Sequence, residues 1–220
     1  ELSYALFDPN NQIMKSVEFA KPTEMLIAQA EKAEYMLDRY DAVVALIERD
    51  FSEKEGFLIE RFQTEKFHGI KAVILQYMLP QLNENSEKLA KMAINDPAAE
   101  VRLAVLESTL RIPSELEPNY RSLLNDSSYQ VIEKALGMLS FYLPQNVGEY
   151  LELTKDERGN RAHNVRIEWL RVAYVNSKEE KYLDELVDYT SNSFEFLTRV
   201  NAARALQQLN VFNEAALANL

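Results

Sequence analysis

A short apolar motif returns about every 30 to 35 residues along this chain of 220 residues, and it constrains the fold more than any other feature. Successive copies from the second onward are 31, 30, 34 and 35 residues apart, which is typical of a helical pair that is used repeatedly. Each copy is a six-residue run, and the leading residues are Ile70, Val101, Val131, Val165 and Val200, with a fainter earlier copy that begins at Tyr40.

Each copy of the motif is predicted to form the second helix of such a pair. Asp96-Pro97 suggests where one of these helices begins, because aspartate caps a helix well and proline suits its first position. Asp126 and Asn160 stand at the same distance before the next two copies. Between the copies, apolar residues spaced i, i+3 and i+4 predict partner helices over 23–34, 53–64, 86–94, 115–124, 146–156 and 178–190.

One helical pair cannot bury its own apolar stripe, so neighbouring pairs are expected to stack. The predicted fold is therefore an all-α, HEAT/ARM-like α-α superhelix of about six helical pairs over residues 21–220. A globular α-bundle is the alternative, and the even period disfavours it. Only 5 Gly and 7 Pro leave little room for the turns of an all-β protein.

Residues 1–20 lack the repeat and are predicted to form a β-hairpin. The turn sequence Asp8-Pro9-Asn10-Asn11 lies between two short apolar segments, which contain Tyr4, Leu6, Ile13, Val17 and Phe19. Because a lone hairpin is only marginally stable in water, we expect it to be the remnant of a preceding β domain or to pack on the first helices. The chain begins at Glu1 without a methionine, and we therefore expect it to be a piece of a longer protein.

Charge and composition narrow the possible functions. The net charge of -11 argues against general nucleic-acid binding, which depends on neutralising phosphates with basic residues. The absence of cysteine rules out disulfides and thiolate metal sites. No apolar run approaches the roughly 20 residues that a membrane-spanning helix needs, so we expect no membrane span.

Three parts of the sequence resemble one enzyme family. The run from Phe7 to Phe19 (Phe-Asp-Pro-Asn-Asn-Gln-Ile-Met-Lys-Ser-Val-Glu-Phe) resembles the last β-hairpin before the helical domain of M1-family zinc aminopeptidases. Residues 33–42, with Asp-Arg-Tyr-Asp-Ala at 38–42, are similar to the first helical pair of that domain. Residues 67–71 and 96–102 are similar to its HEAT-type units. The resemblance extends over essentially the whole chain.

The resemblance implies that the full-length parent is a zinc enzyme that removes N-terminal residues from peptides. Its catalytic His-Glu-x-x-His and Gly-x-Met-Glu-Asn motifs have no counterpart here, so no catalytic residue or zinc ligand can be assigned to this chain. The implied role is a non-catalytic C-terminal domain that packs on the catalytic and β domains of the same polypeptide and shapes access of the peptide substrate. The alternative is a stand-alone HEAT-type scaffold for protein–protein interaction.

The residues themselves offer little support for independent catalysis. The only histidines are His68 and His163, and Glu65-x-x-His68 has the spacing of a di-iron bundle ligand pair without the second copy that such a site requires. No serine lies in a Gly-x-Ser-x-Gly elbow, and no glycine-rich phosphate loop is present. We therefore predict no metal site, and an independent hydrolase has no residue constellation to support it. Pairs of carboxylates are interpreted as solvated helix faces.

A row of basic residues on the second helices is the candidate functional site. In stacked helical pairs, equivalent positions of one helix row form a ladder along one side. Such a ladder could receive a peptide carboxylate or an acidic partner, or its members could pair with acids of the neighbouring repeat and hold the stack in register. The candidates for the first role are Lys71, Arg102, Arg166 and Arg199, and Lys134 and Arg204 lie at related positions. The polar segment 155–164 is either a contact loop or a plain connection.

Overall fold

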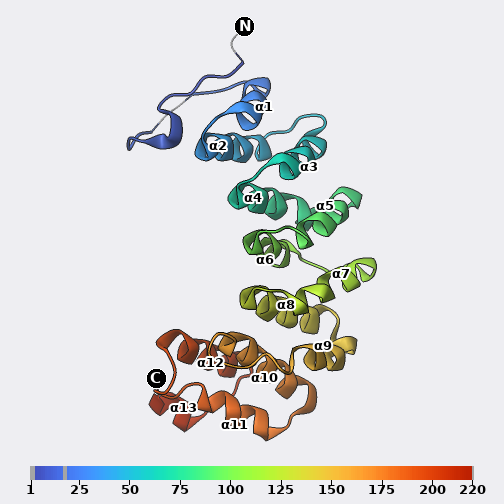
Figure 1. The fold of residues 1–220 in the computed structure, drawn as a ribbon, viewed down its shortest axis with the longest axis vertical. Helices are drawn as coiled ribbons and strands as arrows, with labels where there is room; N and C mark the ends of the chain where they lie inside the picture. The colour runs from blue at the N-terminus through green and yellow to red at the C-terminus, as the bar shows by residue number, and fades with distance from the viewer. Residues whose placement is uncertain (1–2, 17–18, 220) are drawn as a thin grey trace. The chain divides into compact units, whose positions relative to one another are not determined.

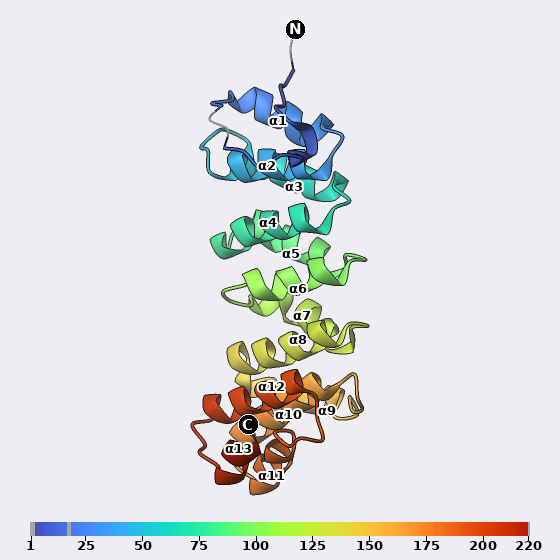
Figure 2. The same cartoon turned by 90° about the vertical axis from the view of Figure 1, so that its left-hand side faces the viewer.

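The computed structural model describes residues 3–16 and 19–219, and this part of the chain contains thirteen α-helices and no β-strand. It folds as two compact units, one ending at Leu110 and the other beginning at Arg111 (Figures 1 and 2). The first unit contains α1 (Thr23–Lys32), α2 (Met36–Ile47), α3 (Lys54–Thr64), α4 (His68–Met78), α5 (Glu84–Ile94) and α6 (Ala99–Ser108).

The second unit contains seven of the described α-helices: α7 (Glu117–Ser122), α8 (Tyr129–Tyr142), α9 (Val147–Thr154), α10 (His163–Ser177), α11 (Glu180–Asp188), α12 (Phe196–Gln208) and α13 (Glu214–Asn219). Short 3-10 helices lie between several of the α-helices, among them Leu79–Gln81, Ser114–Leu116 and Pro144–Asn146. The six predicted helical pairs are confirmed, from α1 and α2 through to α11 and α12. Helix α13 is an addition that the period did not predict.

Within each unit, the second helix of one pair packs against the second helix of the next. Helices α2, α4 and α6 follow one another in the first unit, and α8, α10 and α12 do so in the second. The leading residues Ile70, Val101, Val131 and Val165 of the sequence motif are fully buried. In these four copies the motif therefore places an aliphatic residue in the core between neighbouring helices, whereas Tyr40 and Val200 of the outer copies are partly buried.

The second helices begin later than the capping pattern predicted. Helix α6 begins at Ala99, so Pro97 is not its first residue, and that prediction is wrong by two positions. Asp96 instead accepts a hydrogen bond from the backbone N–H of Ala98 at 2.9 Å, and Asp126 likewise accepts one from Ser128 at 2.7 Å. These bonds close the turn that leads into each helix, which is a common role for aspartate.

The predicted β-hairpin over residues 1–20 is wrong for residues 3–16 and 19–20, which contain no strand; Val17 lies outside the described residues. The Asp-Pro-Asn-Asn sequence does turn the chain, as a 3-10 helix over Pro9–Asn11 with Asp8 and Asn10 at positive φ. The turn bonds to helix α2: the backbone N–H of Asn10 donates to the Asp38 carboxylate, and the Asn11 side chain donates to Asp41.

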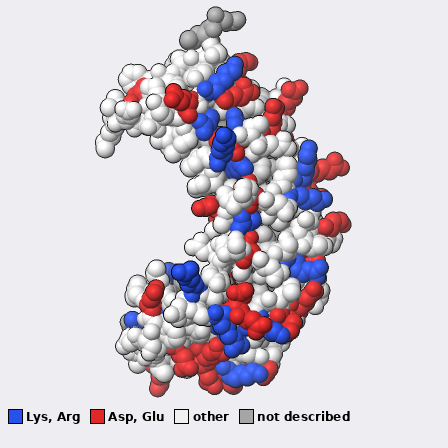
Figure 3. All heavy atoms as spheres, in the orientation of Figure 1, with Lys and Arg blue, Asp and Glu red and all other residues white. Residues whose placement is uncertain are grey.

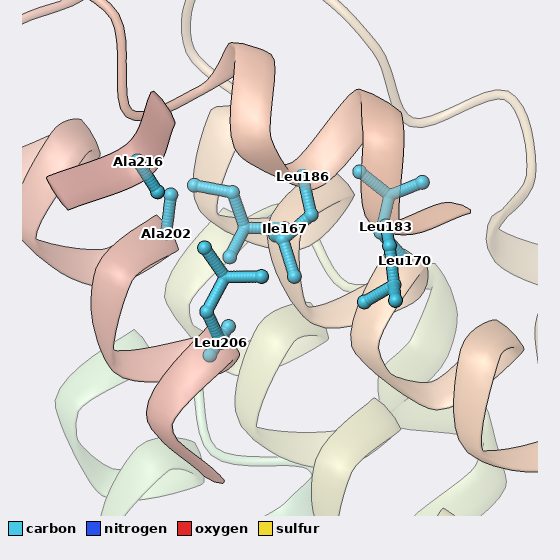
Figure 4. Close-up of a cluster of buried hydrophobic side chains, with 8 residues drawn as sticks. Ile167, Leu170, Leu183, Leu186, Ala202, Leu206 and Ala216 are labelled. Atoms are coloured by element: carbon cyan, nitrogen blue, oxygen red, sulfur yellow. The ribbon is translucent and has the colours of Figure 1, made fainter. Parts of the chain in front are cut away.

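Side chains from four helices of the second unit converge on one apolar cluster (Figure 4). Leu170 on α10 is 0% exposed and belongs to this cluster together with Leu183 and Leu186 of α11 and Leu206 of α12. Helix α13 closes the cluster through Ala216. This cluster therefore holds α10, α11, α12 and α13 together.

We expect Leu170→Ala to lower the free energy of unfolding by about 2–5 kcal/mol, because it leaves a cavity in this cluster. The matched control is Leu197→Ala on α12, where the side chain is 70% exposed and the loss should stay below about 1 kcal/mol. Urea denaturation of both variants measures the difference. Equal losses at the two positions would contradict the assignment of Leu170 to a packed core.

Candidate functional site

Two of the four basic candidates, Lys71 and Arg102, meet at the loop that joins α5 to α6. Lys71 Nζ lies 2.6 Å from Oδ2 of Asp96, and it also lies over the ring of Phe62, 5.1 Å from the centroid. Arg102 reaches the same loop from the other side, where its Nη1 donates to the backbone oxygens of Asp96 and Pro97 at 2.8 and 3.1 Å. Lys71 on α4 and Arg102 on α6 therefore both bond to the loop between α5 and α6.

A related arrangement occurs one repeat earlier, where Glu65 occupies the position of Asp96. Arg39 on α2 donates to the Glu65 carboxylate from Nε at 3.0 Å and from Nη2 at 3.1 Å. The backbone N–H groups of Lys66 and Phe67 donate to the same carboxylate at 2.8 and 3.0 Å. Each acid lies five residues before a leading residue, Ile70 or Val101, so the repeat itself places this carboxylate.

The charge of Glu65 is stabilised in this buried position. Burial raises the pKa of the Glu65 carboxyl, but the hydrogen bonds from Arg39 and from the backbone N–H groups of Phe67 and Lys66 outweigh it, so the pKa lies below its usual value. Sequence reasoning considered Glu65 only beside His68 and missed Arg39. The sequence did contain a signal for the role of Glu65, because Glu65 and Asp96 occupy the same position of the repeat.

In the second unit, Arg166 and Arg199 also contact neighbouring helices and loops. The side chain of Arg166 is 5% exposed; its Nε and Nη2 donate to Glu185 at 2.7 and 2.6 Å, and its guanidinium lies 4.3 Å from the ring centroid of Trp169. Arg199 Nε donates to the backbone oxygen of Thr190 at 3.3 Å, and its Nη2 donates to that of Asn219 at 2.6 Å. These bonds tie α10 to α11, and α12 to the ends of α11 and α13.

All four candidate side chains thus bond to other parts of their own unit. This is the arrangement expected if the row holds the repeats in register. Lys134 and Arg204 differ, since both are exposed, and the hydrogen bond of Arg204 to Asn201 is long, at 3.5 Å. Contact of Lys71, Arg102, Arg166 or Arg199 with a substrate or partner stays a prediction.

The two histidines lie beside aromatic rings. His68 contacts Phe67, with ring centroids 4.9 Å apart, and His163 contacts Tyr189 and Phe194 at 5.6 and 5.2 Å. The Glu65 carboxylate is engaged by Arg39, so the Glu65–His68 pair does not fit a metal site. The described part of the chain contains no group of three or more His, Cys, Asp or Glu side chains that could hold a metal ion, and none of its helices is long and apolar enough to cross a membrane.

One pair of carboxylates, Glu133 on α8 and Glu168 on α10, departs from the expectation of solvated helix faces. The two helices pack together, and Glu168 accepts hydrogen bonds from Nη2 and Nε of Arg171 at 2.6 and 2.8 Å. Burial, together with the negative charge of Glu168, raises the pKa of Glu133 to about 7. Gly137 lies one helical turn after Glu133, and a Cβ at residue 137 would overlap the Glu168 carboxylate. That mid-helix glycine was the only sequence signal for this cluster.

The fold defines this protein as an all-helical chain built from successive helical pairs. No family model matches the sequence, and no curated protein matches it either. The contacts of the chain itself are therefore the structural basis for a functional proposal.

Replacing Glu65 with Gln tests the carboxylate that the repeat places before α4. Glu65→Gln leaves Arg39 with a neutral partner in a mostly buried position, and we expect a loss of about 3 kcal/mol of unfolding free energy at pH 7. Because the folded-state pKa is lowered, the stabilisation is present above the ordinary value of 4.5 and is lost as the pH falls through the folded-state value. The difference between wild type and variant should therefore shrink in acid.

The control for this test is Glu60→Gln on the exposed side of α3, where the change should stay within about 0.5 kcal/mol. Denaturant unfolding at pH 7 and at pH 3 gives both comparisons. A loss at Glu65 no larger than the loss at Glu60 would show that the Arg39 pair does not stabilise the first unit.

Glu133 predicts a pH dependence of the opposite sign. Its folded-state pKa of about 7 is above the ordinary value of 4.5, so this group destabilises the folded state progressively as the pH rises from 4.5 to 7. Glu133→Gln removes the titration, and we expect the variant to be more stable than wild type at pH 8 by about 1–2 kcal/mol after solvent screening is allowed for. At pH 4 the two should unfold at similar denaturant concentrations. An unchanged or lower stability of the variant at pH 8 would contradict this.

Proposed function

We propose that this chain is a non-catalytic helical domain of an M1-type zinc aminopeptidase. In this proposal it packs over the catalytic domain and shapes the access of peptides, while the zinc and the catalytic residues belong to the full-length parent. The repeated pairs α1–α2 through α11–α12 are proposed to be HEAT-type units of one α-α superhelix.

The observation that carries the proposal is a contact between the two segments with the most specific resemblance. The backbone N–H of Asn10 donates to both carboxylate oxygens of Asp38 at 3.2 Å, and the Asn11 side chain donates to Asp41 at 3.0 Å. Asp38 is buried, and its backbone oxygen accepts a hydrogen bond from Gln29 at 2.6 Å. The Asp-Pro-Asn-Asn turn and the Asp-Arg-Tyr-Asp run thus form one junction (Figure 1, dark blue against α2).

The run from Asp38 to Asp41 therefore has two structural tasks. Asp38 and Asp41 attach the segment before the helices, and Arg39 between them reaches forward to Glu65 in the next pair. Arg39 Nη1 also donates to the backbone oxygens of Ala33 and Glu34 at 3.1 and 2.9 Å. Because these bonds depend on three side chains within four residues, a domain that joins a preceding segment to stacked pairs has a physical reason to use this sequence.

Exposed apolar side chains give a second line of support. Within the described residues of the N-terminal segment, Phe7, Ile13, Met14 and Phe19 are exposed. Several large apolar side chains close together in one segment are typical of a surface that another part of a protein covers. A neighbouring domain of the same polypeptide, as the proposal requires, would cover them.

The coding region before Glu1 provides the direct test of this proposal. We expect the same reading frame to encode His-Glu-x-x-His followed by a later glutamate, because zinc needs both histidines, that glutamate and an open position for water. The purified chain alone should release no product from amino-acid anilides, whereas the full-length protein should cleave them and lose that activity on treatment with a chelator. An upstream region without the motif would overturn the aminopeptidase proposal and favour a stand-alone interaction scaffold.

A further inference from the structure

A pocket in the first unit lies between the N-terminal segment and helices α1 and α2. It has a volume of about 320 Å³, which is within the range of small-molecule sites. Its lining is half polar and half apolar, so it suits an occupant that has both kinds of surface. The apolar residues of the lining are Leu6, Phe7, Phe19, Leu26, Ala42 and Ala45.

The charged residues that line this pocket are sorted by sign between its two walls. Lys15 and Lys21 come from the N-terminal segment, whereas Asp38 and Asp41 come from α2. Lys15 is already neutralised, because its Nζ forms an ion pair with Asp8 of the same segment. The remaining charges that an occupant would meet are one ammonium group on one wall and two carboxylates on the other.

Lys21 retains the capacity to bind an anion. Its Nζ donates to Oε1 of Gln29 at 2.5 Å, which within the described residues uses one of the three donors of the ammonium group. Burial lowers the pKa of Lys21, and the charges of Asp38 and Asp41 oppose that shift, so the lysine is close to both carboxylates. Its bonded partner is nevertheless an uncharged amide.

A buried glutamine fixes the position of Lys21 relative to α2. Gln29 on α1 is 2% exposed and lines the pocket. Its Oε1 accepts from Lys21, and its Nε2 donates to the backbone oxygen of Asp38 at 2.6 Å. The amide therefore joins the two walls and holds their opposite charges near each other.

On the α2 wall, Asp41 is the carboxylate that can receive a cation. Its Oδ2 accepts one hydrogen bond, from the Asn11 side chain at 3.0 Å, and the residue is exposed. A carboxylate offers about four acceptor positions, so Asp41 has room for an ammonium group. Asp38 is buried, and both of its carboxylate oxygens already accept from the backbone N–H of Asn10.

We infer that this pocket binds a small zwitterion with an apolar side chain, its carboxylate directed to Lys21 and its ammonium directed to Asp41. A simple anion would face the two carboxylates of α2, and a simple cation would face Lys21, so a compound that has both charges fits the two walls best. A free apolar α-amino acid and a short apolar peptide share this chemistry. The inference concerns a site on this chain alone and does not depend on the proposed parent enzyme.

Titration of the intact chain with L-leucine, followed by backbone amide NMR shifts, tests the inference. At pH 6 the α-amino group is protonated, and we expect shifts confined to the N-terminal segment, α1 and α2. Leucinamide lacks the carboxylate and N-acetyl-leucine lacks the ammonium group, so each should bind at least about fivefold more weakly. Glycine should also bind more weakly, because it has no side chain to contact the apolar residues.

Leucyl-leucine distinguishes the two sources of the zwitterion. Preferential binding of L-leucine supports a free amino acid, and binding of leucyl-leucine alone supports a short peptide. Failure of both compounds to bind would overturn the inference. Leucinamide or N-acetyl-leucine binding as tightly as L-leucine would also overturn it.

Two variants test the named charges separately. Asp41→Asn should weaken L-leucine binding about fivefold and abolish the preference over N-acetyl-leucine, whereas Lys21→Gln should weaken it about fivefold and abolish the preference over leucinamide. The matched controls are Asp50→Asn and Lys88→Gln, which change exposed residues outside the pocket and should bind as wild type does. Amide spectra report whether each variant is folded. Wild-type affinity in a folded Asp41→Asn or Lys21→Gln variant would show that this pocket is not the binding site.

Discussion

Every helical pair in this protein depends on burying an apolar stripe that the pair cannot cover by itself. An aliphatic residue near the start of α4, α6, α8 and α10 carries this constraint, and Ile70, Val101, Val131 and Val165 are all fully buried. Since the hydrophobic effect is proportional to the area removed from water and has no direction, it brings the helices together without fixing how they slide or rotate. The register of the stack must therefore be set by interactions that depend on direction, such as hydrogen bonds.

Charged side chains near the N-termini of the second helices form these directional interactions. A carboxylate in the preceding turn accepts backbone N–H groups, as Glu65 and Asp96 do, and a cation from the preceding pair reaches it. Such bonds form only at particular distances and angles, so they select one arrangement among many that bury similar area. In the second unit, the bidentate contact of Arg166 with Glu185 and its stacking on Trp169 have the same effect. The charges of the row thus serve first to position helices.

Against this background, groups that the packing does not use are informative. The N-terminal segment keeps apolar side chains exposed although its turn is bonded to Asp38 and Asp41, and this supports a covering domain. A groove between α8 and α10 is lined by the exposed Phe141 and by Ser140, whose buried Oγ has no hydrogen-bond partner within the described residues. Acidic side chains also gather on the surface around α11, toward the lower part of Figure 3, where five of the ten residues from 179 to 188 are acidic and one is basic. Among these acids, Glu185 bonds to Arg166 and Glu179 to Lys181, whereas Glu133 lies beside Glu168 of a neighbouring helix.

The sequence alone determined that the described chain is all-helical and where its six pairs lie, because a period of 30 to 35 residues and a 3.6-residue apolar spacing are both local patterns. It did not determine the form of residues 3–16 and 19–20, since a turn such as Asp8–Asn11 occurs with or without paired strands, and the bonds of Asn10 and Asn11 to α2 join residues about 30 positions apart. It left both roles of the basic row open, because Lys71 and Asp96 are 25 residues apart and no local rule pairs them. Tertiary structure alone placed Glu133 beside Glu168 and gave Glu133 its raised pKa, because that shift requires burial and a neighbouring charge from a different helix.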